Sequence, residues 1–328
     1  MSHLILTAIG DGGADSVRLV EDDDLDGAGL DVDELLVAIE AAPVNPAFFL
    51  MAAGRYPVRP VLPAALGAEG VGRVLRAGAG VDPSLVGRRV IVLPTYEQGT
   101  WAERVVVPAR NAVPVDDAGD PLQQAMIGVN PATAWVLLHK YVELAPGDWI
   151  GQNLANSAVG QYVVALAERA GVRTLNVVRR AEAAKQVDAD VVLVDGPDLA
   201  DRVAGALRGE RLKAVFDGVG GDAVGPLAGA LGNGGTVIAY SSVTGQAPAV
   251  PVTELIGRDI RVRGLFVIDW VRTAPREELQ QVYRELAALV TDGTLTATVE
   301  ATYPLTGYRA ALEHARRTGR TGKVLFTP

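Results

Sequence analysis

The sequence contains no cysteine and only three histidines among its 328 residues. Without cysteine there are no disulfide bonds, no thiolate metal ligands and no cysteine nucleophile, a composition typical of proteins that work in a reducing interior. Basic side chains are also scarce, since 30 lysines and arginines face 39 aspartates and glutamates and the net charge is −9. An acidic chain without a basic block is not expected to bind nucleic acid or an anionic membrane surface. These features favour a cytoplasmic protein in which locally placed arginines bind any anionic ligand.

A long apolar run that could cross a membrane is also missing. Residues 1–13 lack a basic region followed by a long apolar stretch, so they predict a first strand and not a signal peptide. One uncharged stretch, residues 223–253, has sufficient length, but Pro226, Asn233 and Gln246 interrupt its apolar character. We interpret it as a buried strand with loops.

An acidic run near the N-terminus resembles a calcium-binding loop. Asp22, Asp24 and Asp26 alternate as they do in such loops. A loop of that kind needs a helix on each side, whereas residues 16–20 and 35–39 are predicted to be strands. We therefore expect no calcium site here, and no metal site elsewhere in the chain.

The length suits two domains, because single hydrophobic cores rarely grow past roughly 250 to 300 residues. The first part alternates short β-rich runs with Gly/Pro turns, and the runs are residues 35–40, 70–75, 89–93 and 103–107. The pattern then changes to strands alternating with helical segments, which is typical of a parallel sheet. The sequence predicts an α/β protein with a mostly β domain (residues 1–118, completed by 269–328) and a doubly wound parallel-sheet domain (119–268).

The second domain contains a candidate dinucleotide site. Residues 148–153 predict a strand, residues 154–161 a turn of small residues, and residues 162–169 a helix. This order lets the backbone approach a pyrophosphate, while the N-terminus of the helix offers free N–H groups. Gly160 is the glycine expected to contact the cofactor, although Ala155 and Ser157 replace the usual glycines of the turn.

The end of the next predicted strand, residues 173–178, indicates which dinucleotide binds. Arg179 and Arg180 follow where an NAD enzyme would have an acidic residue for the ribose hydroxyls. Guanidinium groups form bidentate, charge-assisted hydrogen bonds with phosphate, so NADPH is favoured over NADH. A solvated pair of arginines at a helix start is the alternative interpretation.

Two later strand ends extend this pattern. The first carries Asp217, Gly218 and Val219, and the second carries Tyr240 and Ser241. Ligands of open α/β sheets bind at the carboxyl ends of the strands, so these residues are candidates to line a cofactor. Ordinary turns between strand and helix explain them equally well.

At this point the sequence resembles the medium-chain dehydrogenase/reductase superfamily, most closely its mitochondrial-type 2-enoyl thioester reductases, with the NADPH:quinone oxidoreductases next. The resemblance covers nearly the whole chain, and residues 42–46, 54–56, 67–71, 99–101, 129–134, 152–161 and 176–179 carry it. It implies a GroES-like catalytic domain beside a Rossmann domain, NADPH as the cofactor, a small-molecule substrate and a homodimer. It also implies cofactor contacts from Asn130, Thr133, Asn156, Ser157, Ala158, Val159, Gly160, Phe266, Val267 and Lys323.

The zinc-dependent branch of this superfamily carries cysteine and histidine ligands that are missing here. Ala68 lies between Gly67 and Glu69, where the zinc branch has the histidine of Gly-His-Glu. A catalytic zinc is therefore not expected. His139 is interpreted as a packing or surface residue.

The resemblance also implies catalytic and substrate residues. In the enoyl reductases a tyrosine of the Gly-x-Tyr segment donates a proton, and Tyr56 matches it, while Asn45 would orient the substrate or nicotinamide. A pocket-shaping role is the alternative for Tyr56. Trp101, Phe266 and Trp270 would form the wall of the substrate pocket, and core packing explains Phe266 and Trp270 nearly as well.

Two departures from the family pattern concern the same sites. Residues 180–191 are shorter than the usual helix of the family, which affects the adenosine side of the cofactor site, and Pro57 restricts Tyr56 to an extended backbone. The leading hypothesis is an NADPH-dependent trans-2-enoyl thioester reductase. A quinone or other α,β-unsaturated carbonyl reductase is the alternative, and a non-enzymatic NADPH-binding protein is a third class.

Overall fold

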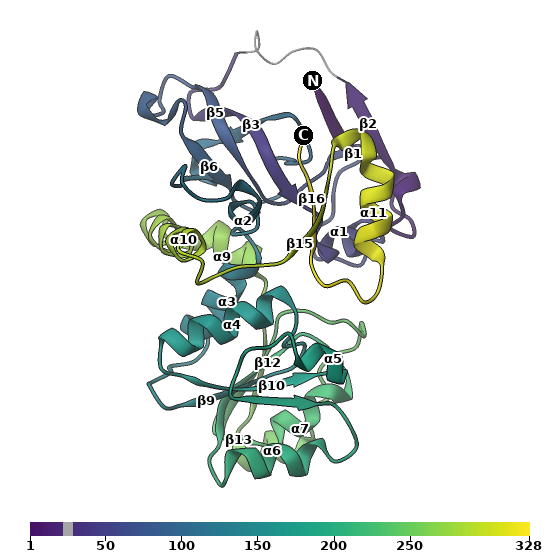
Figure 1. Ribbon diagram of the computed structural model, residues 1–328, viewed down its shortest axis with the longest axis vertical. Coiled ribbons are helices and arrows are strands. Elements are labelled where there is room, and N and C mark those ends of the chain that lie inside the picture. Colours follow the sequence, from purple (N-terminus) through teal and green to yellow (C-terminus); the bar gives the residue numbers. More distant parts are fainter. Residues whose placement is uncertain (22–28) are drawn as a thin grey trace. The chain divides into compact units, whose positions relative to one another are not determined.

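Figure 1 shows the computed structural model, which describes residues 1–21 and 29–328. The chain forms two compact units. Unit 1 consists of Met1–Val129 and Ile268–Pro328, and unit 2 consists of Asn130–Val267. Asp22, Asp24 and Asp26 of the acidic run lie outside the described residues.

Unit 1 is built mainly from strands. One sheet has the order β2-β1-β4, with bounds β1 Ser2–Leu6, β2 Val17–Glu21 and β4 Ala64–Ala65. The larger sheet has the order β15-β16-β3-β5-β6-β8, and β7 pairs with β3. Its strands are β3 Glu34–Pro43, β5 Gly70–Ala77, β6 Arg89–Val92, β7 Arg104–Pro108, β8 Ala112–Pro114, β15 Val299–Tyr303 and β16 Lys323–Phe326. The four β-rich runs predicted from the sequence coincide with β3, β5, β6 and β7.

Strand β3 is the centre of this sheet. It pairs antiparallel with β5, β7 and β16, which explains why Leu35, Val37 and Ile39 are buried. The helices of unit 1 are α1 Pro46–Ala52, α2 Pro121–Gln124, α10 Arg276–Thr291 and α11 Tyr308–Arg316, together with α9 Val267–Thr273, which starts on the last residue of unit 2. The returning chain thus completes the β unit with β15, α11 and β16.

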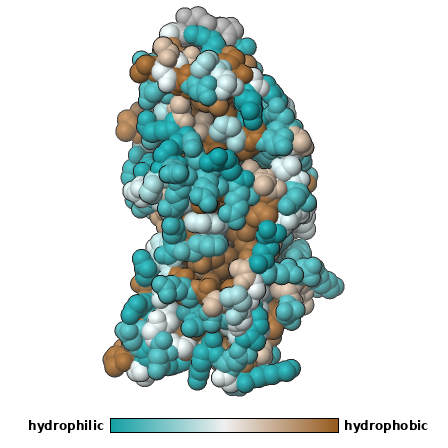
Figure 2. Space-filling view, turned by 90° about the vertical axis from the view of Figure 1, so that its left-hand side faces the viewer, coloured by the Kyte–Doolittle hydropathy of each residue, from teal (hydrophilic) through white to brown (hydrophobic). Residues whose placement is uncertain are grey.

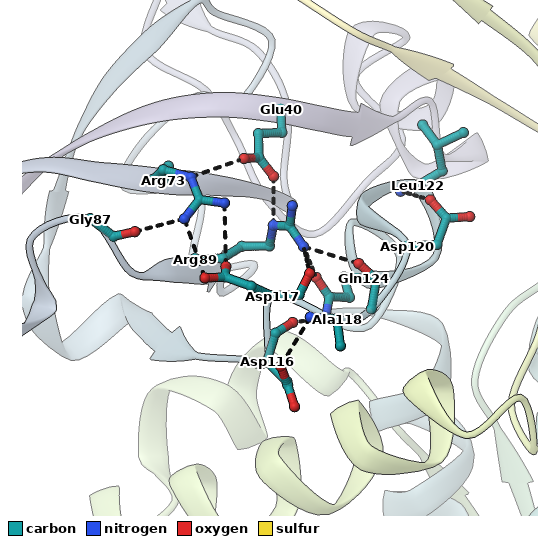
Figure 3. A network of polar contacts seen from close by, with 11 residues as sticks. Glu40, Arg73, Gly87, Arg89, Asp116, Asp117, Ala118, Asp120, Leu122 and Gln124 are labelled. Carbon is teal, nitrogen blue, oxygen red and sulfur yellow. Dashed lines mark hydrogen bonds and ion pairs between the residues drawn. The ribbon is translucent and has the colours of Figure 1, made fainter.

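A buried ion pair ties the segment after β8 to unit 1 (Figure 3). The Arg89 guanidinium donates from Nε to Glu40 Oε2 at 2.6 Å, and from Nη1 to the carbonyl oxygen of Asp117 at 3.0 Å. Gln124 is fully buried, and its Nε2 donates to the carbonyl oxygen of Asp116 at 2.7 Å. Charged and amide groups in this position are satisfied only within unit 1.

The predicted start of the second domain at residue 119 differs from the start of unit 2 at Asn130. The reason is α2, which packs against β3, β5 and α10. Its helical pattern is the first after a series of strands, and the local sequence cannot show which sheet it covers. At the other end of unit 2, the predicted and observed limits differ by one residue (268 and Val267).

Unit 2 is a parallel sheet with the strand order β11-β10-β9-β12-β13-β14. The strands are β9 Trp149–Gln152, β10 Arg173–Val178, β11 Val191–Val194, β12 Leu212–Asp217, β13 Leu231–Ala239 and β14 Arg261–Gly264. The helices are α3 Asn130–His139, α4 Ala158–Arg169, α5 Ala181–Ala184, α6 Leu199–Leu207, α7 Gly225–Ala228 and α8 Val252–Arg258. This order is that of a doubly wound dinucleotide-binding fold, with the switch point between β9 and β12. The predicted α/β fold class is confirmed.

Most of the large apolar side chains lie inside the two units. On the face drawn in Figure 2, hydrophilic residues cover most of the surface and hydrophobic residues are grouped in patches between them. Among the helices of residues 1–21 and 29–328, none is both long and apolar enough to cross a membrane.

Candidate functional site

The turn after β9 presents the N-terminus of α4. Leu154 has a positive φ of 55°, which reverses the chain, and Ser157 is the N-cap residue of the helix. The Ser157 hydroxyl oxygen accepts a hydrogen bond from the Gly160 N–H at 3.1 Å. Asn156, Ser157, Ala158 and Val159 thus lie in or beside the first turn, where free N–H groups and the helix dipole favour an anion.

Two buried amides hold this turn to the sheet. Gln152, at the end of β9, donates from Nε2 to the Gly160 carbonyl oxygen at 2.9 Å and to Asn176 Oδ1 at 2.7 Å. Asn176, in β10, donates from Nδ2 to Thr174 Oγ1 at 2.8 Å. Both amide side chains are fully buried, so they link β9, β10 and α4 in a low-dielectric interior where such bonds are strong.

Gly160 itself is a packing residue in this structure. A Cβ atom at this position would lie 2.4 Å from the Ala155 carbonyl oxygen. The absence of a side chain therefore lets the first turn of α4 approach the preceding loop, as the last glycine of a dinucleotide turn does. The sequence analysis expected Gly160 to contact the cofactor, and that contact stays a prediction.

We expect Gly160→Ala to lower the free energy of unfolding by about 2 kcal/mol or more, because the backbone of Ala155 must move to make room. Gly205→Ala is the matched control. Gly205 lies inside α6 with nothing within 4 Å of its Cβ position, so alanine there should stabilise by about 0.5–1 kcal/mol. Urea unfolding followed by circular dichroism measures both. Equal effects of the two substitutions would contradict the packing role.

A second group of polar residues lies where β12 ends. The Asp217 Oδ1 atom accepts a hydrogen bond from Asn153 Nδ2 at 2.6 Å and from the N–H groups of Val219 and Gly220 at 3.1 Å each. The Asn153 Oδ1 atom accepts from the Gly218 N–H at 2.8 Å. The Asp217 Oδ2 atom is buried and has no hydrogen-bond partner among the described residues. Asn153 was not named as a site residue from the sequence, although it directly follows β9.

Tyr240 joins this group from the end of β13. A Cβ atom on Gly218 would lie 2.7 Å from the Tyr240 hydroxyl oxygen, so only glycine fits between them. Burial raises the pKa of Tyr240 to about 12, and the nearby Asp217 carboxylate adds to this, whereas Ser157 opposes it. The hydroxyl has no hydrogen-bond partner among the described residues. Ser241, the next residue, is exposed.

Arg179 and Arg180 follow β10 at the same edge of the sheet. Both side chains are exposed, and within residues 1–21 and 29–328 neither makes a hydrogen bond or an ion pair. Most exposed arginines in this chain pair with a carboxylate or a carbonyl oxygen, as Arg173 does with Glu210. Helix α5 after them is a single turn, in keeping with the short segment noted in the sequence. The two guanidinium groups are therefore available to an anionic ligand.

The other predicted cofactor residues of unit 2 lie on α3 and after β14. Asn130 and Thr133 are buried in the first turn of α3, and the Asn130 Nδ2 atom has no hydrogen-bond partner among the described residues. Phe266 is half-buried and Val267 is buried. The Asn130 amide is thus a second buried polar group, besides the Asp217 carboxylate, that protein atoms leave unsatisfied.

In unit 1, Asn45 lies between a carboxylate and an ammonium group. Its Nδ2 atom donates to Glu69 Oε1 at 2.6 Å, and its Oδ1 atom accepts from Lys323 Nζ at 3.0 Å. Asn45 caps the start of α1, Glu69 precedes β5, and Lys323 begins β16. Two residues that the sequence analysis named separately, Asn45 and Lys323, thus share a hydrogen bond, and Glu69 joins them. The sequence analysis used Glu69 only to mark the missing zinc histidine.

Tyr56 packs beside Tyr96 in unit 1. The two ring centroids are 6.1 Å apart with an angle of 54° between the planes. Burial raises the pKa of Tyr56, and the Tyr96 hydroxyl partly offsets the rise. Tyr96 has a φ of 60°, a left-handed conformation that is rare for a tyrosine and that marks backbone strain beside Tyr56. Tyr96 was not identified from the sequence.

The predicted wall of the substrate pocket does not stay together. Trp101 is only 1% exposed and packs in the core of unit 1 between the rings of Phe48, at 4.9 Å, and Phe326, at 5.0 Å. Its Nε1 atom donates to the Pro43 carbonyl oxygen at 3.2 Å. Because this side chain has no surface left for a substrate, we assign it to the core. Trp270 is half-buried in α9, and its Nε1 atom donates to Glu278 Oε1 at 3.3 Å.

The three histidines occupy separate environments. His139 stacks on the ring of Trp135 at 4.5 Å, and His314 bonds to Glu300 and Tyr303. Among the described residues, no group of three or more histidine, aspartate or glutamate side chains is placed to share a metal ion.

Comparisons with known proteins agree with this architecture. The family model described as "Alcohol dehydrogenase GroES-like domain" matches residues 31–117, and the model described as "Zinc-binding dehydrogenase" matches residues 158–289. The mitochondrial enoyl-acyl-carrier-protein reductase of Mus musculus is 32% identical over 333 residues, covering 95% of this chain and 86% of the mouse protein. The Arabidopsis thaliana protein of the same name is 33% identical over 303 residues, covering 90% of this chain and 80% of the plant protein.

Solved structures show the same fold. A mycobacterial quinone oxidoreductase superposes with a TM-score of 0.85 and 27% identity over 100% of both chains. The mitochondrial 2-enoyl thioester reductase heterodimer of Candida tropicalis superposes with a TM-score of 0.86 and 23% identity, over 100% of this chain and 99% of that one.

A GroES-like unit completed by the C-terminal segment, together with a doubly wound parallel sheet, defines an oxidoreductase of the alcohol dehydrogenase type. The chain belongs to the zinc-free branch of the medium-chain dehydrogenase/reductase superfamily, within the family of the enoyl-acyl-carrier-protein reductases. The resemblance on which the sequence analysis depended is confirmed.

Proposed function

We propose that this protein is an NADPH-dependent reductase of trans-2-enoyl thioesters carried by coenzyme A or acyl carrier protein. The observation that carries the proposal is Tyr56, a buried tyrosine in the catalytic-type unit of a chain that is 32% identical to enoyl reductases. A raised pKa keeps its hydroxyl protonated at neutral pH, as a proton donor requires.

NADPH as the cofactor is supported by unit 2. The first turn of α4 offers N–H groups to the pyrophosphate, and Arg179 and Arg180 offer two unpaired guanidinium groups to the 2′-phosphate. The unsatisfied Asp217 and Asn130 side chains and the Tyr240 hydroxyl fit a polar ligand at the carboxyl ends of β9, β12 and β13. We propose that Gly218, Val219, Ser241, Phe266 and Val267 complete the lining.

The chemistry assigns separate tasks to the two units. NADPH, when bound, supplies a hydride to the β-carbon of the enoyl group and leaves as NADP⁺. Tyr56 then donates its hydroxyl proton to the α-carbon, directly or through water, so that the C=C bond becomes a saturated bond. The substrate carbonyl oxygen carries negative charge during this step, and hydrogen-bond donors such as Tyr56 stabilise it.

Quinone reduction is the second candidate. A full-length match to a mycobacterial quinone oxidoreductase favours it, at 27% identity. A quinone carries its two oxygens in conjugation, so protonation by solvent can follow hydride transfer. Such a reaction depends less on a tyrosine beside the α-carbon.

The experiment that tests the proposal is NADPH oxidation with crotonyl-CoA, hexenoyl-CoA and benzoquinone as acceptors, with NADH in parallel. We expect turnover of the thioesters with NADPH. Turnover of benzoquinone alone would move the protein to the second candidate. NADPH binding without turnover of any acceptor would assign it to the non-enzymatic class.

The predicted homodimer is supported by one edge of unit 2. Strand β14 ends the sheet, and all four of its residues are exposed. Ile256, on the preceding helix α8, is 81% exposed, and Val262 lies on the strand itself. An unpaired edge with exposed apolar side chains suits pairing with a second copy. Sedimentation equilibrium should then give particles of two chains. The cytoplasmic location stays a prediction, since the named relatives are mitochondrial, and cell fractionation tests it.

A further inference from the structure

The amide of Asn45 has one favourable orientation. Its NH₂ group faces the Glu69 carboxylate at 2.6 Å and its oxygen faces the Lys323 ammonium at 3.0 Å. A flipped amide would place its oxygen against a carboxylate and its NH₂ against an ammonium, and both contacts would be repulsive. The charges of Glu69 and Lys323 therefore determine which way Asn45 points.

Glu69 is fixed by contacts on both of its oxygens. Oε2 accepts the Val129 N–H at 2.8 Å, and a Cβ atom on Gly128 would lie 3.0 Å from the same oxygen. The side chain is 1% exposed, so it has no surface with which to touch a substrate. Whatever Glu69 contributes to the site, it contributes through Asn45.

Lys323 retains capacity for a ligand. An ammonium group has three donors, and within the described residues Asn45 is the partner recorded for one of them. The charge is half-buried, which makes an unsatisfied donor costly. An oxygen of a bound cofactor or substrate would complete its hydrogen bonds.

We propose that Glu69 is a positioning residue of the reductase: its ionised carboxylate orients the Asn45 amide, and Asn45 in turn directs the Lys323 ammonium toward a ligand oxygen. This inference rests on the proposed function in taking Asn45 and Lys323 as substrate or cofactor residues. It adds a carboxylate whose place in the zinc-free branch is independent of any metal.

The arrangement depends on pH. Burial raises the pKa of Glu69 to about 7, although Asn45, Lys323 and the N–H of Val129 oppose this. Burial lowers the pKa of Lys323 to about 8, with Arg320 adding to the effect and Glu69 opposing it. The other titratable groups that face Glu69 are the hydroxyls of Tyr96 and Tyr283.

Because the pKa of Glu69 is raised, the carboxyl gains a proton as the pH falls through about 7. The protonated oxygen becomes a donor that opposes the Asn45 NH₂, so the amide flips and the ammonium loses its partner. The dissociation constant of NADPH should therefore rise roughly tenfold from about pH 7.5 to about pH 6 in the wild type. The 2′-phosphate titrates in the same range, so a variant must separate the two effects.

Glu69→Gln supplies that separation. A glutamine can accept from Asn45 or from Val129 but not from both, and at pH 7.5 we expect NADPH to bind about tenfold to a hundredfold more weakly. The change in affinity that depends on Glu69 titration should disappear, leaving only that of the phosphate. Glu40→Gln is the matched control, because Glu40 is a partly buried acid of β3 that pairs with Arg89 and Arg73.

The double variant Glu69→Gln/Asn45→Asp tests the mechanism directly. Glutamine would accept from Val129 and donate to the new aspartate, which would accept from Lys323, so every donor regains an acceptor. We expect NADPH affinity within about threefold of the wild type, measured by fluorescence titration. A folded double variant that binds as weakly as Glu69→Gln would overturn the proposal, as would unchanged affinity in Glu69→Gln.

A signal that needs no ligand separates this inference from the proposed function. The side-chain NH₂ resonances of Asn45, assigned by their loss in Asn45→Asp, should shift with a midpoint near pH 7 in the wild type and stay constant in Glu69→Gln. If NADPH does not bind, the proposed function fails, and these resonances still decide the positioning. Resonances that do not respond to pH would refute it.

Discussion

Replacing Arg179 and Arg180 together by serine is expected to weaken NADPH binding about a hundredfold or more while NADH binding changes by less than about threefold. Both side chains are exposed at the end of β10 and have no partner among the described residues, so their loss removes no internal contact. A hydrogen bond to a charged group contributes about 1.5–3 kcal/mol, and about 1.4 kcal/mol corresponds to a factor of ten in affinity. Fluorescence titration with both dinucleotides measures the change.

The control for this prediction is Arg169→Ser. Arg169 is equally exposed but lies in the last turn of α4, at the end opposite the Ser157 cap. It removes the same kind of charge from the same unit, so a general electrostatic effect would weaken NADPH binding there as well. If the double variant loses affinity for NADH as strongly as for NADPH, the arginines do not recognise the 2′-phosphate. The salt dependence of NADPH binding should also decrease in the double variant.

The parts of the fold and site that could be predicted from the sequence are local. The strand, turn and helix from β9 to α4 follow from a short apolar run, small residues and an N-cap serine within about twenty residues. The same holds for Arg179 and Arg180, whose place after β10 is a matter of counting along one strand. Because β9 and β10 are parallel neighbours, their carboxyl ends meet at one edge of the sheet.

The parts that were missed depend on contacts between distant segments. Glu69 lies 24 residues from Asn45, and Lys323 lies 278 residues from it, so no spacing rule links the three. Trp101 was assigned to a pocket because an aromatic after Gly99-Thr100 looks the same whether it faces a ligand or a core. Only the rings of Phe48 and Phe326 on either side show that it is core.

The strain at Tyr96 is a further feature that composition cannot reveal. A tyrosine gives no local signal for a left-handed φ, which is usually found at glycine or asparagine. The surrounding side chains fix this turn, since the Thr95 hydroxyl accepts a hydrogen bond from Asn111 Nδ2 at 3.0 Å. Tertiary contacts therefore place Tyr96 against Tyr56.

Tyr56→Phe is expected to lower kcat for enoyl thioesters about a hundredfold or more, because a positioned general acid contributes roughly 10² to 10⁴ in rate. Benzoquinone reduction, where solvent can supply protons, should change by less than about threefold. Both rates are measured by NADPH oxidation under the same conditions. The phenylalanine ring keeps the contact with Tyr96, so thermal unfolding should stay within a few degrees of the wild type.

The pH profile of kcat gives a second measurement of the same role. Burial raises the pKa of Tyr56 above its ordinary value of 10, so the hydroxyl keeps its proton and the rate should show no loss from this group below that pH. Tyr308→Phe, which removes a hydroxyl from α11 in the same unit, is the control and should leave thioester turnover unchanged. Equal thioester rates for Tyr56→Phe and the wild type would rule out the proton-donor role. Parallel losses with thioester and quinone would instead make Tyr56 a residue that shapes the pocket for any acceptor.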